Sequence, residues 1–373
     1  MLPLMPLQMT PSYPRLEVNL DILEENARVL LEKCHSWGIS PVVVTKGFLA
    51  DPVLACAFRD FGFAKFADSN LANLVRLRGL FGPQVVLFLI RLPMLEELDT
   101  LNAYGIVPFV SHGEVLERLN SVAWKSGKVQ PVVLAIEGGD GREGMLFEEI
   151  PEVAKLLQRL PYVSVYGIAT TLACLSGVLP GWDTLDRLMQ VKEFLQGVLG
   201  RDIVLSVGGT TFLALWEEDP PWGVDEIRFG EALLFGSDIS RKRNIPWLRQ
   251  GAFVISAEIV EVRTKEPLKE GAFGYDAFGK QPSQSFSGPR KRILVAIGKQ
   301  DVDENQLYFD DAHVTIVGAT SNYLVLDVEE STKSYQVGDI VSFRAGYGAV
   351  LRAFLSPYVA KVYRGRKTGE GER

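Results

Sequence analysis

The sequence predicts an α/β protein, a TIM (β/α)8 barrel followed by an all-β C-terminal domain. The first observation is that eight short apolar segments alternate with amphipathic segments over about 200 residues, the size and pattern of such a barrel. The second is a change, after about residue 240, to apolar residues that recur with a period of two. An open doubly wound sheet is the alternative, but it rarely joins eight uninterrupted βα units.

The predicted barrel occupies residues 14–240. Its first helix covers residues 20–37, where apolar residues recur at helical spacing and Gly38 supplies a C-cap. The eight strands that follow are predicted at 42–45, 63–67, 85–90, 107–110, 131–137, 163–169, 203–207 and 225–229. The segments between them are amphipathic with a helical period, as in "SNLANLVRLRGL" and "WDTLDRLMQVKEFLQGVLG".

The predicted β domain occupies residues 241–365. Its period-two segments, separated by Gly, Asn and Asp turns, are "AFVISAEIVEVRTK", "KRILVAIGKQDV", "AHVTIVGATSNYLVLDVEE" and "DIVSFRAGYGAVLRAF". No amphipathic run of helix length interrupts them, so no helix is expected here. Residues 1–13 could pack on this domain, and the charged tail 366–373 is expected to be frayed.

Composition restricts the cell compartment and the partners. A net charge of −7 and a pI of about 5.3 argue against nucleic acid or an anionic membrane as the main partner. The longest strand-like apolar run, "VVLFLI", is far shorter than the ~20 residues of a membrane helix, and the N-terminal segment lacks the basic region of a signal peptide. Three cysteines cannot form a disulfide framework in a chain of this length. We therefore expect a soluble cytoplasmic protein.

A lysine follows the first apolar strand of the predicted barrel. In "PVVVTKGFLADP", residues 41–52, Lys46 comes after a β-branched run, and Asp51–Pro52 is typical of a helix start. Lys46 is either a solvated residue that caps the strand or an amine nucleophile in an apolar pocket. The active site of a TIM barrel lies at the C-terminal ends of its strands, so the other strand ends bear on this choice.

The ends of the seventh and eighth strands have the residues of a phosphate site. They contain "SVGGTT" and "RFGEALLFG", and glycine lets backbone N–H groups approach a phosphate while Ser and Thr hydroxyls add donors. The loops after these two strands are the usual phosphate site of this barrel. A lysine at strand one together with a phosphate site favours pyridoxal 5'-phosphate, which forms a Schiff base with lysine.

Taken jointly and in order, several segments resemble the alanine-racemase-like (fold type III) pyridoxal phosphate enzymes, most closely the ornithine racemase branch. The resemblance covers nearly the whole chain, from "YPRLEVNLDILEENARVL" to "SPYVAKV". The matching segments are "VVVTKGF", "ADSNLANL", "EGGDGREGM", "GIATTLAC", "SVGGTT", "RFGEALLFG", "GYDAFG", "AIGKQDV" and "LSPYV".

The resemblance implies an amino-acid racemase that transfers a Cα proton between two bases. Lys46 would carry the cofactor as a Schiff base, and Arg228 would face the pyridine nitrogen, which a permanently charged guanidinium leaves unprotonated. Arg142 would lie near the substrate, where its fork geometry suits a carboxylate. The residues implied at the cofactor phosphate are Ser206, Gly208, Gly209, Thr210, Gly230 and Tyr358. A structural salt bridge at Arg228 and simple core packing at Tyr358 are the alternatives.

The second base departs from the alanine racemase pattern. That family carries a tyrosine in a segment of the form "IGYAD", contributed by the β domain of the partner subunit, whereas this chain has "IGKQD" with Lys299 in that place. Tyr275, in "GYDAFG", is the other candidate, and the sequence leaves both open. Each face of the planar carbanion needs a proton acceptor. The resemblance therefore implies a homodimer with shared active sites.

Other departures argue against alanine as the substrate. Ala135 stands at the carbamylated-lysine position of the family, and Thr170 or Thr171 at that of the histidine beside the cofactor oxygen. Both changes match the ornithine branch, so the expected substrate is ornithine or a similar basic amino acid. Its distal ammonium needs an acidic partner, for which the candidates near the predicted barrel mouth are Glu137, Asp140, Glu143 and Glu231.

Other functions are compatible with part of this pattern. A non-catalytic pyridoxal-phosphate-binding protein of this fold would lack a β domain. A lyase of the D-threonine aldolase kind would need a metal held by His and Cys, but His35, His112 and His313 are widely spaced, so no metal site is expected. A decarboxylase stays open, because the same fold and cofactor support that reaction.

Overall fold

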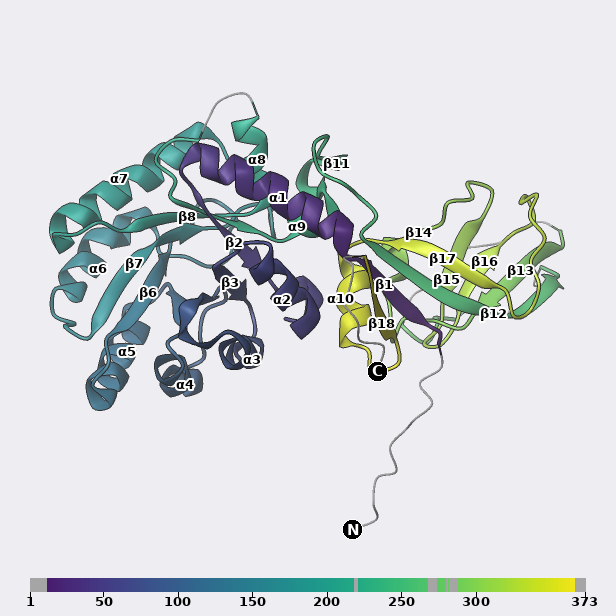
Figure 1. Cartoon of the computed structure of the whole chain (residues 1–373), viewed down its shortest axis with the longest axis horizontal. Helices are drawn as coiled ribbons and strands as arrows, with labels where there is room; N and C mark the ends of the chain where they lie inside the picture. Colours follow the sequence, from purple (N-terminus) through teal and green to yellow (C-terminus); the bar gives the residue numbers. More distant parts are fainter. Residues whose placement is uncertain (1–11, 218–220, 268–273, 280, 282–287, 366–373) are drawn as a thin grey trace, which may run out of the picture. The chain divides into compact units, whose positions relative to one another are not determined.

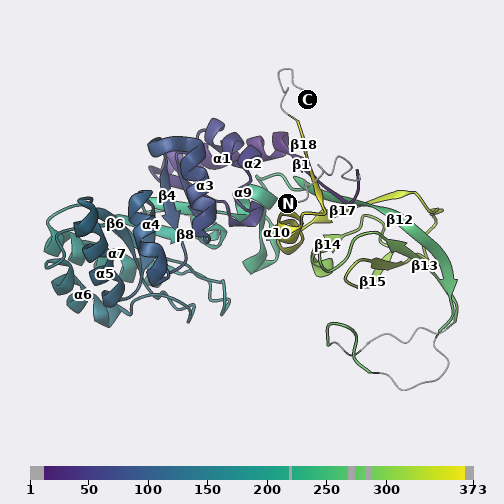
Figure 2. The same ribbon diagram turned by 90° about the horizontal axis from the view of Figure 1, so that it is seen from below.

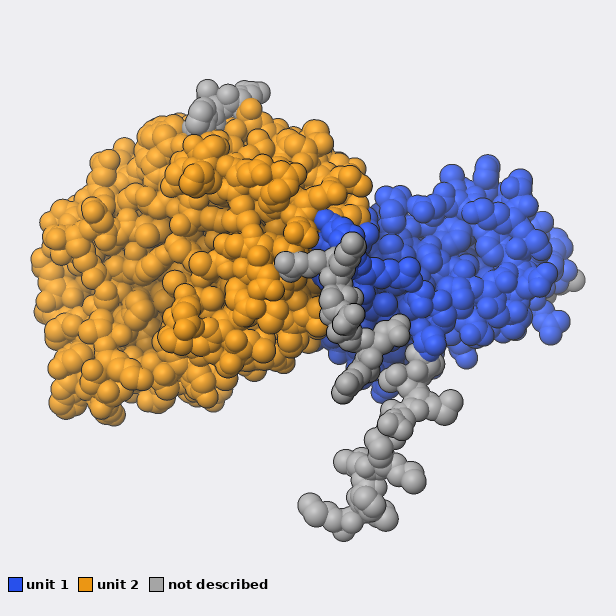
Figure 3. Space-filling model, viewed as in Figure 1, with its two compact units in different colours: residues 1–21, 251–373 blue, residues 22–250 orange. Residues whose placement is uncertain are grey.

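The computed structural model describes residues 12–217, 221–267, 274–279, 281 and 288–365. The chain divides into two compact units, one of Met1–Asp21 with Gly251–Arg373 and one of Ile22–Gln250, here termed the β unit and the barrel unit (Figure 3). Among the described residues, no helix combines the length and the apolar character that a bilayer span requires.

Eight parallel strands in the described part of the barrel unit close into a barrel in sequence order (Figure 1). All eight predicted strands are confirmed, and the sheet is not open. The strands are β2 Ser40–Val44, β3 Lys65–Asp68, β4 Val86–Leu89, β5 Val107–Val110, β6 Gln130–Ala135, β7 Val163–Thr170, β8 Val204–Gly208 and β9 Glu226–Phe229. Because β9 pairs with both β8 and β2, the first and the last two strands of the barrel are neighbours.

Helices cover the outside of the barrel strands (Figures 1 and 2). The predicted first helix is confirmed as α1, and α2 starts at Pro52 after Asp51, whose carboxylate accepts hydrogen bonds from the N–H groups of Val53 and Leu54 at 3.0 and 3.1 Å. The helices are α1 Leu20–Trp37, α2 Pro52–Asp60, α3 Leu71–Phe81, α4 Leu98–Ala103, α5 Gly113–Ser126, α6 Ile150–Leu157, α7 Trp182–Leu199, α8 Thr210–Leu213 and α9 Glu231–Phe235. A short hairpin of β10 Ser237–Asp238 and β11 Arg243–Asn244 follows them.

The barrel interior is apolar on one side and polar on the other. Strands β2 to β7 contribute a buried apolar cluster of Val42, Val44, Ala67, Phe88, Val107, Phe109, Val133 and Ala169. Strands β8 and β9 instead carry buried Ser206, Glu226 and Arg228. The guanidinium of Arg228 lies 5.1 Å from the ring centroid of Phe109. Buried polar groups are costly unless they are hydrogen-bonded, so this polar side of the interior marks the region where function is expected.

The β unit is built on a mostly antiparallel sheet, as predicted for the C-terminal domain. Its strands are β1 Arg15–Asn19, β12 Phe253–Lys265, β13 Arg290–Val295, β14 Leu307–Tyr308, β15 Thr315–Ala319, β16 Leu324–Asp327, β17 Ile340–Ala345 and β18 Ala360–Arg364. Strand β1 pairs antiparallel with β12 and parallel with β18, burying Leu16 and Val18. The unit boundaries therefore differ from the predicted barrel range 14–240, because this strand precedes the barrel in sequence but pairs with strands that follow it.

The expectation of no helix in the C-terminal region is wrong. Helix α10 (Tyr347–Leu355) follows β17 directly, with Gly346 as its N-cap. It buries Ala349, Val350, Ala353 and Phe354, which share one helix face because they are spaced by about one turn. A short apolar run of this kind is compatible both with the two-residue period of a strand and with the 3.6-residue period of a helix, and its length does not decide between them. The expected frayed tail at 366–373 and most of 1–13 lie outside the described residues.

Candidate active site

Lys46 lies in a tight turn at the C-terminal end of β2. The strand ends at Val44, and Lys46 opens a single 3-10 turn, Lys46–Phe48. The carbonyl of Thr45 accepts hydrogen bonds from the N–H groups of Phe48 and Ala50, both at 3.1 Å. Leu49 and Ala50 have φ values of 55° and 47°, in the left-handed region that side chains other than glycine rarely adopt. A conformation of this cost persists only where the surroundings hold it, and it clusters at functional sites.

Asp68 holds this turn from the neighbouring strand, a role that the sequence did not single out. Its side chain is fully buried at the end of β3, and its Oδ2 accepts a 2.5 Å hydrogen bond from the hydroxyl of Thr45. Its Oδ1 accepts from the backbone of Asn70 at 2.8 Å and from the side chain of Asn73 at 3.2 Å. Burial raises the pKa of Asp68, while these donors and the charge of Lys46 oppose the rise. Lys46 thus sits within electrostatic range of a buried carboxyl group.

Arg228 is fixed on β9 inside the barrel. Its side chain is buried, with the residue 3% exposed. One terminal nitrogen donates to the hydroxyl of Ser206 at 2.7 Å, and the other donates to the Thr170 carbonyl at 2.7 Å and the Thr171 hydroxyl at 2.9 Å. Burial lowers the pKa of Arg228 to about 10, against the opposing charge of Glu226. Arg228 therefore keeps its proton at neutral pH.

Five of the six residues predicted at the cofactor phosphate lie in or just after β8 and β9, and the sixth, Tyr358, lies in the β unit. Gly208 pairs with Arg228 across the two strands, and a Cβ added to Gly208 would meet the Thr171 hydroxyl at 2.9 Å. Gly209 follows with a φ of 71°, which favours glycine. The hydroxyl of Thr210 accepts a 2.9 Å hydrogen bond from the N–H of Ala232 and so links the two strand ends. Thr171 and the Arg228 carbonyl therefore occupy the space that side chains at Gly208 and Gly209 would take.

Ser206 and Gly230, which also belong to the predicted phosphate set, have other protein groups as neighbours. Ser206 is buried one pleat deeper than Gly208, and its hydroxyl donates to Glu226 at 2.8 Å while it accepts from Arg228. A phosphate contact would have to replace one of these partners. Gly230 lies against Val44 of β2, its added Cβ meeting Val44 at an ordinary 3.6 Å. Arg228 and Gly208 thus lie on the paired strands β9 and β8, and Lys46 follows the end of β2, the other neighbour of β9.

Two of the acidic candidates stabilise the loops at the barrel mouth by accepting hydrogen bonds from them. Glu137 accepts hydrogen bonds from the N–H groups of Gly139, Gly141 and Arg142 at 2.6, 3.2 and 3.0 Å. Asp140 accepts from the next loop, at Leu175 and Ser176. Burial would raise the pKa of both carboxyl groups, but the hydrogen-bond donors outweigh it and hold each pKa below its usual range. The hydrogen-bonding capacity of these two carboxylates is therefore used largely within the protein.

The other two acidic candidates have fewer backbone partners. Glu143 forms an ion pair with Arg142, whose terminal nitrogen donates to it at 2.8 Å. The charges of both residues act on Arg228, so this loop overlies the same mouth. Glu231 accepts from the Ser237 hydroxyl and the Ile239 N–H, both at 2.8 Å, and burial raises the pKa of Glu231 to about 7.

The remaining predicted site residues lie in the β unit. Lys299 is held by an ion pair with Glu304, Nζ to Oε1 at 3.4 Å, and stands 4.2 Å from the ring centroid of Phe278. These two contacts restrain the Lys299 side chain within the β unit. Tyr275 and Tyr358 are 77% and 67% exposed. Lys299 and Tyr358 line one hollow of about 350 Å³.

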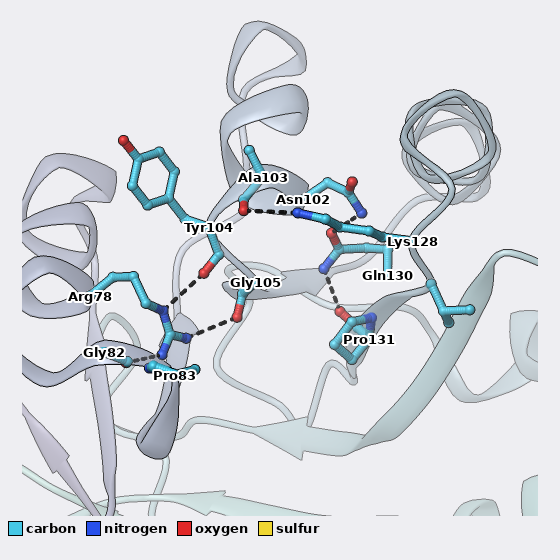
Figure 4. Close-up of a pocket in the computed structure, with 11 residues that line it drawn as sticks. Arg78, Gly82, Pro83, Asn102, Ala103, Tyr104, Gly105, Lys128, Gln130 and Pro131 are labelled. Atoms are coloured by element: carbon cyan, nitrogen blue, oxygen red, sulfur yellow. Dashed lines mark hydrogen bonds between the residues drawn. The ribbon is translucent and has the colours of Figure 1, made fainter.

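A second hollow, of about 480 Å³, lies at the opposite, N-terminal ends of β4 to β6 (Figure 4). Its main cation, Arg78, donates to the carbonyls of Tyr104, Gly82, Val85 and Gly105 at 2.6 to 3.1 Å. A guanidinium with these four hydrogen bonds connects neighbouring loops and has few N–H donors left for an anionic ligand. In TIM barrels this end serves stability, and catalysis lies at the other end. No group of His, Cys, Asp and Glu in the described ranges could hold a metal ion.

Comparisons with known proteins identify the family of the chain. A family model described as "Alanine racemase, N-terminal domain" matches residues 18–238. The chain belongs to this family. It is 35% identical over 357 residues to the lysine racemase of Thermotoga maritima, covering 94% of this chain and 98% of that protein. It is 32% identical over 352 residues to the ornithine racemase of Acetoanaerobium sticklandii, covering 94% and 99%.

Solved structures of the alanine racemase family share the fold. The alanine racemase of Bartonella henselae, with covalently bound pyridoxal phosphate, superposes with a TM-score of 0.74 over 95% of this chain and 100% of that one. The sequence identity is 16%, so this likeness concerns the fold. It agrees with the barrel followed by a β domain that the sequence predicts.

The residues of this chain fit pyridoxal phosphate, the cofactor that the alanine racemase family implies. Lys46 supplies an amine at the mouth, Arg228 supplies a fixed cation, and Gly208 and Gly209 at the end of β8 place no side chain beside their backbone N–H groups. A phosphorylated aldehyde needs these three features: a nucleophile, an orienting group for the ring and donors for the phosphate. The individual roles stay predictions.

Proposed function

We propose that this protein is a pyridoxal-phosphate-dependent racemase of ornithine or a similar basic amino acid. The relatives that match over nearly their whole length are a lysine and an ornithine racemase, which supports the reaction and the substrate class. The observation that supports the proposal most is that Arg228 and Gly208 lie on the paired strands β9 and β8, and that Lys46 follows the end of β2, which also pairs with β9.

Each residue has a physical task in this proposal. Lys46 would hold the cofactor through its Nζ, and the same amine would take or return the Cα proton of the substrate on one face. The backbone at Gly208 and Gly209, with the hydroxyl of Thr210, would hold the phosphate. Bound pyridoxal phosphate would supply the electron sink that makes the Cα proton acidic. Arg142 orients the substrate carboxylate through its fork of donors.

Arg228 controls the strength of that electron sink. Its proton is retained at neutral pH, because its pKa of about 10 lies well above that range. It can donate a hydrogen bond to the ring nitrogen but does not transfer its proton, which favours return of a proton to Cα over transamination.

The second base belongs to the opposite face of the substrate, and we propose that the β unit of a partner chain supplies it as Lys299 or Tyr275. A homodimer with shared active sites follows. Its support is a set of exposed apolar side chains on the loops after β4, β6 and β7, at 50%, 52%, 53% and 67% exposure, namely Met94, Leu95, Leu146 and Leu175. Covering them would also exclude water from the mouth. Sedimentation should give a dimer, and a fully active monomer would count against it.

We also propose that the enzyme works in the reducing cytoplasm. All three cysteines are free, Cys34 being buried and Cys174 exposed. Cytosolic thiols stay reduced, so an exposed free cysteine is tolerated there.

The proposal is tested with purified protein and a panel of L-amino acids, with formation of the D enantiomer as the readout. Ornithine or lysine should be racemised fastest. Borohydride reduction followed by peptide mapping should place a pyridoxyl group on Lys46 and leave exposed lysines such as Lys155 unlabelled. Release of carbon dioxide or an aldehyde without any D enantiomer would identify a decarboxylase or a lyase and overturn the proposal.

A further inference from the structure

A column of buried polar side chains runs through the barrel interior beneath Arg228. It centres on Glu226, the first residue of β9, which is 1% exposed. Glu226 and Arg228 point to the same side of the strand because side chains alternate along it. Ser206 lies beside Glu226 on the neighbouring strand β8. The sequence motif "RFGEALLFG" begins after this residue, so the motif did not include it.

Two side chains from distant strands hold one oxygen of this carboxylate. Oε2 of Glu226 accepts from the Nζ of Lys65 at 2.8 Å and from the hydroxyl of Tyr166 at 2.9 Å. Lys65 also donates to the Tyr166 oxygen at 3.1 Å. Burial would lower the pKa of Lys65, but the charge of Glu226 outweighs it and raises that pKa. Burial raises the pKa of Tyr166 to about 12, so the tyrosine stays neutral and donates its hydrogen to Glu226.

The other oxygen of Glu226 connects to Arg228 with a fixed direction. Oε1 accepts the hydroxyl hydrogen of Ser206 at 2.8 Å. The Ser206 oxygen is therefore free to accept from the terminal nitrogen of Arg228 at 2.7 Å. A hydroxyl has one hydrogen to donate, so the order Arg228 to Ser206 to Glu226 is the sole arrangement in which both contacts are hydrogen bonds.

We propose that Glu226 is a positioning residue that orients Arg228 through Ser206 and supplies the countercharge of the buried guanidinium. The inference rests on the proposed racemase function and extends it to a residue beneath the site. The charged or ionisable groups that face Arg228 are Glu226 on its own strand and Arg142, Glu143 and Cys174 from the mouth loops. Glu226 is the buried one among the acids, and a buried cation without a countercharge is strongly destabilised.

The alternative is that Glu226 only fills the barrel, as a structural ion pair with Lys65. The two cases differ in what happens when its charge is removed without changing its shape. If Glu226 supports Arg228, removing its charge changes the electrostatics around the guanidinium and the cofactor ring, and the pH profile of the holoenzyme moves to lower pH. If Glu226 is only structural, the variant loses stability and nothing else.

The test is Glu226→Gln in the full-length holoenzyme, with cofactor absorbance titrated against pH beside steady-state kinetics. We expect the alkaline transition of the cofactor spectrum, and the alkaline limb of kcat, to move to lower pH by about one unit. We also expect kcat to fall about tenfold with KM nearly unchanged, and more transamination by-product. Asp225→Asn is the matched control: it is the adjacent acid, pairs with Lys192 at 2.5 Å and is partly exposed, so its pH profile should be parental.

A second variant covers the case in which Glu226→Gln does not fold. Ser206→Ala interrupts the connection and leaves every charge in place, so it should shift the same alkaline transition in the same direction by a smaller amount. Parental transitions and parental by-product ratios in whichever variants fold would overturn the proposal, even if their melting temperatures fall. If the parent protein neither binds the cofactor nor racemises, the proposed function itself has failed, and the two failures are thereby distinguished.

Discussion

The candidate residues of the barrel unit and those of the β unit differ in how they are held. Arg228 is 3% exposed and makes three hydrogen bonds within the barrel unit. In the β unit, Tyr275 and Tyr358 are 77% and 67% exposed. Lys299 is intermediate, since an ion pair with Glu304 restrains it. The barrel part of the site is therefore organised by its own fold, while the β part presents more exposed side chains, which the proposed dimer would cover. Changes in the first should alter chemistry directly, and changes in the second should depend on the partner.

The largest effect is expected at Lys46, the residue that the barrel part depends on most. Lys46→Ala should lower racemisation by a factor of roughly 10³ or more, because both the covalent anchor and one base are lost. The rate of D-ornithine formation and borohydride trapping measure the two losses separately. Lys155→Ala, on the exposed surface of α6, is the control and should behave as the parent. A pyridoxyl adduct on another lysine of Lys46→Ala would show that the barrel part is assigned wrongly.

The second base should give an asymmetric defect. Lys299→Ala or Tyr275→Phe, whichever removes the base, should abolish exchange of the Cα proton with solvent deuterium for one enantiomer while the other still exchanges. The loss should be about 10² to 10⁴-fold, the usual contribution of a positioned base. NMR of each pure enantiomer measures it. Parental exchange of both enantiomers in both variants would exclude these two residues.

Mixing variants tests whether that base comes from a partner chain. Lys46→Ala and the base variant are each expected to be inactive alone. Random mixed dimers would restore roughly a quarter of the parental activity, because half of the dimers would have one intact site of two. If mixing restores nothing, each chain completes its own site, and the contrast between the two units no longer reflects assembly.

A smaller effect is expected at Asp68, which holds the Lys46 turn through Thr45 at 2.5 Å. Asp68→Asn should lower kcat about tenfold while borohydride still labels Lys46, because the amine is retained but its turn is less firmly placed. Asp51→Asn is the matched control on the same connection, since asparagine caps a helix as well as aspartate does. If Asp68→Asn and Asp51→Asn are equally active, the buried carboxylate has no part in placing the lysine.

The smallest effect concerns stability at Glu231. Burial raises the pKa of this carboxyl group from 4.5 to about 7, so its ionisation in the folded protein is unfavourable. The stability it contributes is present below pH 4.5 and is lost as the pH rises through about 7. Glu231→Gln should remove this loss and raise stability near neutral pH by on the order of 1 kcal/mol relative to acidic pH. Melting temperatures at about pH 5 and about pH 8 measure it. An unchanged pH dependence would mean that the carboxylate is solvated.

The sequence alone determined much of the barrel. Strand and helix positions follow from local periodicity, because side chains alternate along a strand and recur every turn along a helix. The rule that barrel sites lie at strand ends was then enough to single out Lys46 and the glycines after β8 before any contact was known. The same local reasoning failed for α10, where a run of nine residues is compatible with both periods.

The tertiary structure alone decided which distant side chains meet. Lys65, Tyr166 and Glu226 are hydrogen-bonded to one another because closure of the barrel brings side chains of three strands together in its interior. No local sequence pattern predicts that contact. The acidic candidates show the same limit: sequence placed Glu137 and Asp140 near the mouth, but only the folded loops show that backbone N–H groups occupy them. Periodicity is set within a few residues of chain, whereas hydrogen-bond partners depend on register and closure across the whole barrel.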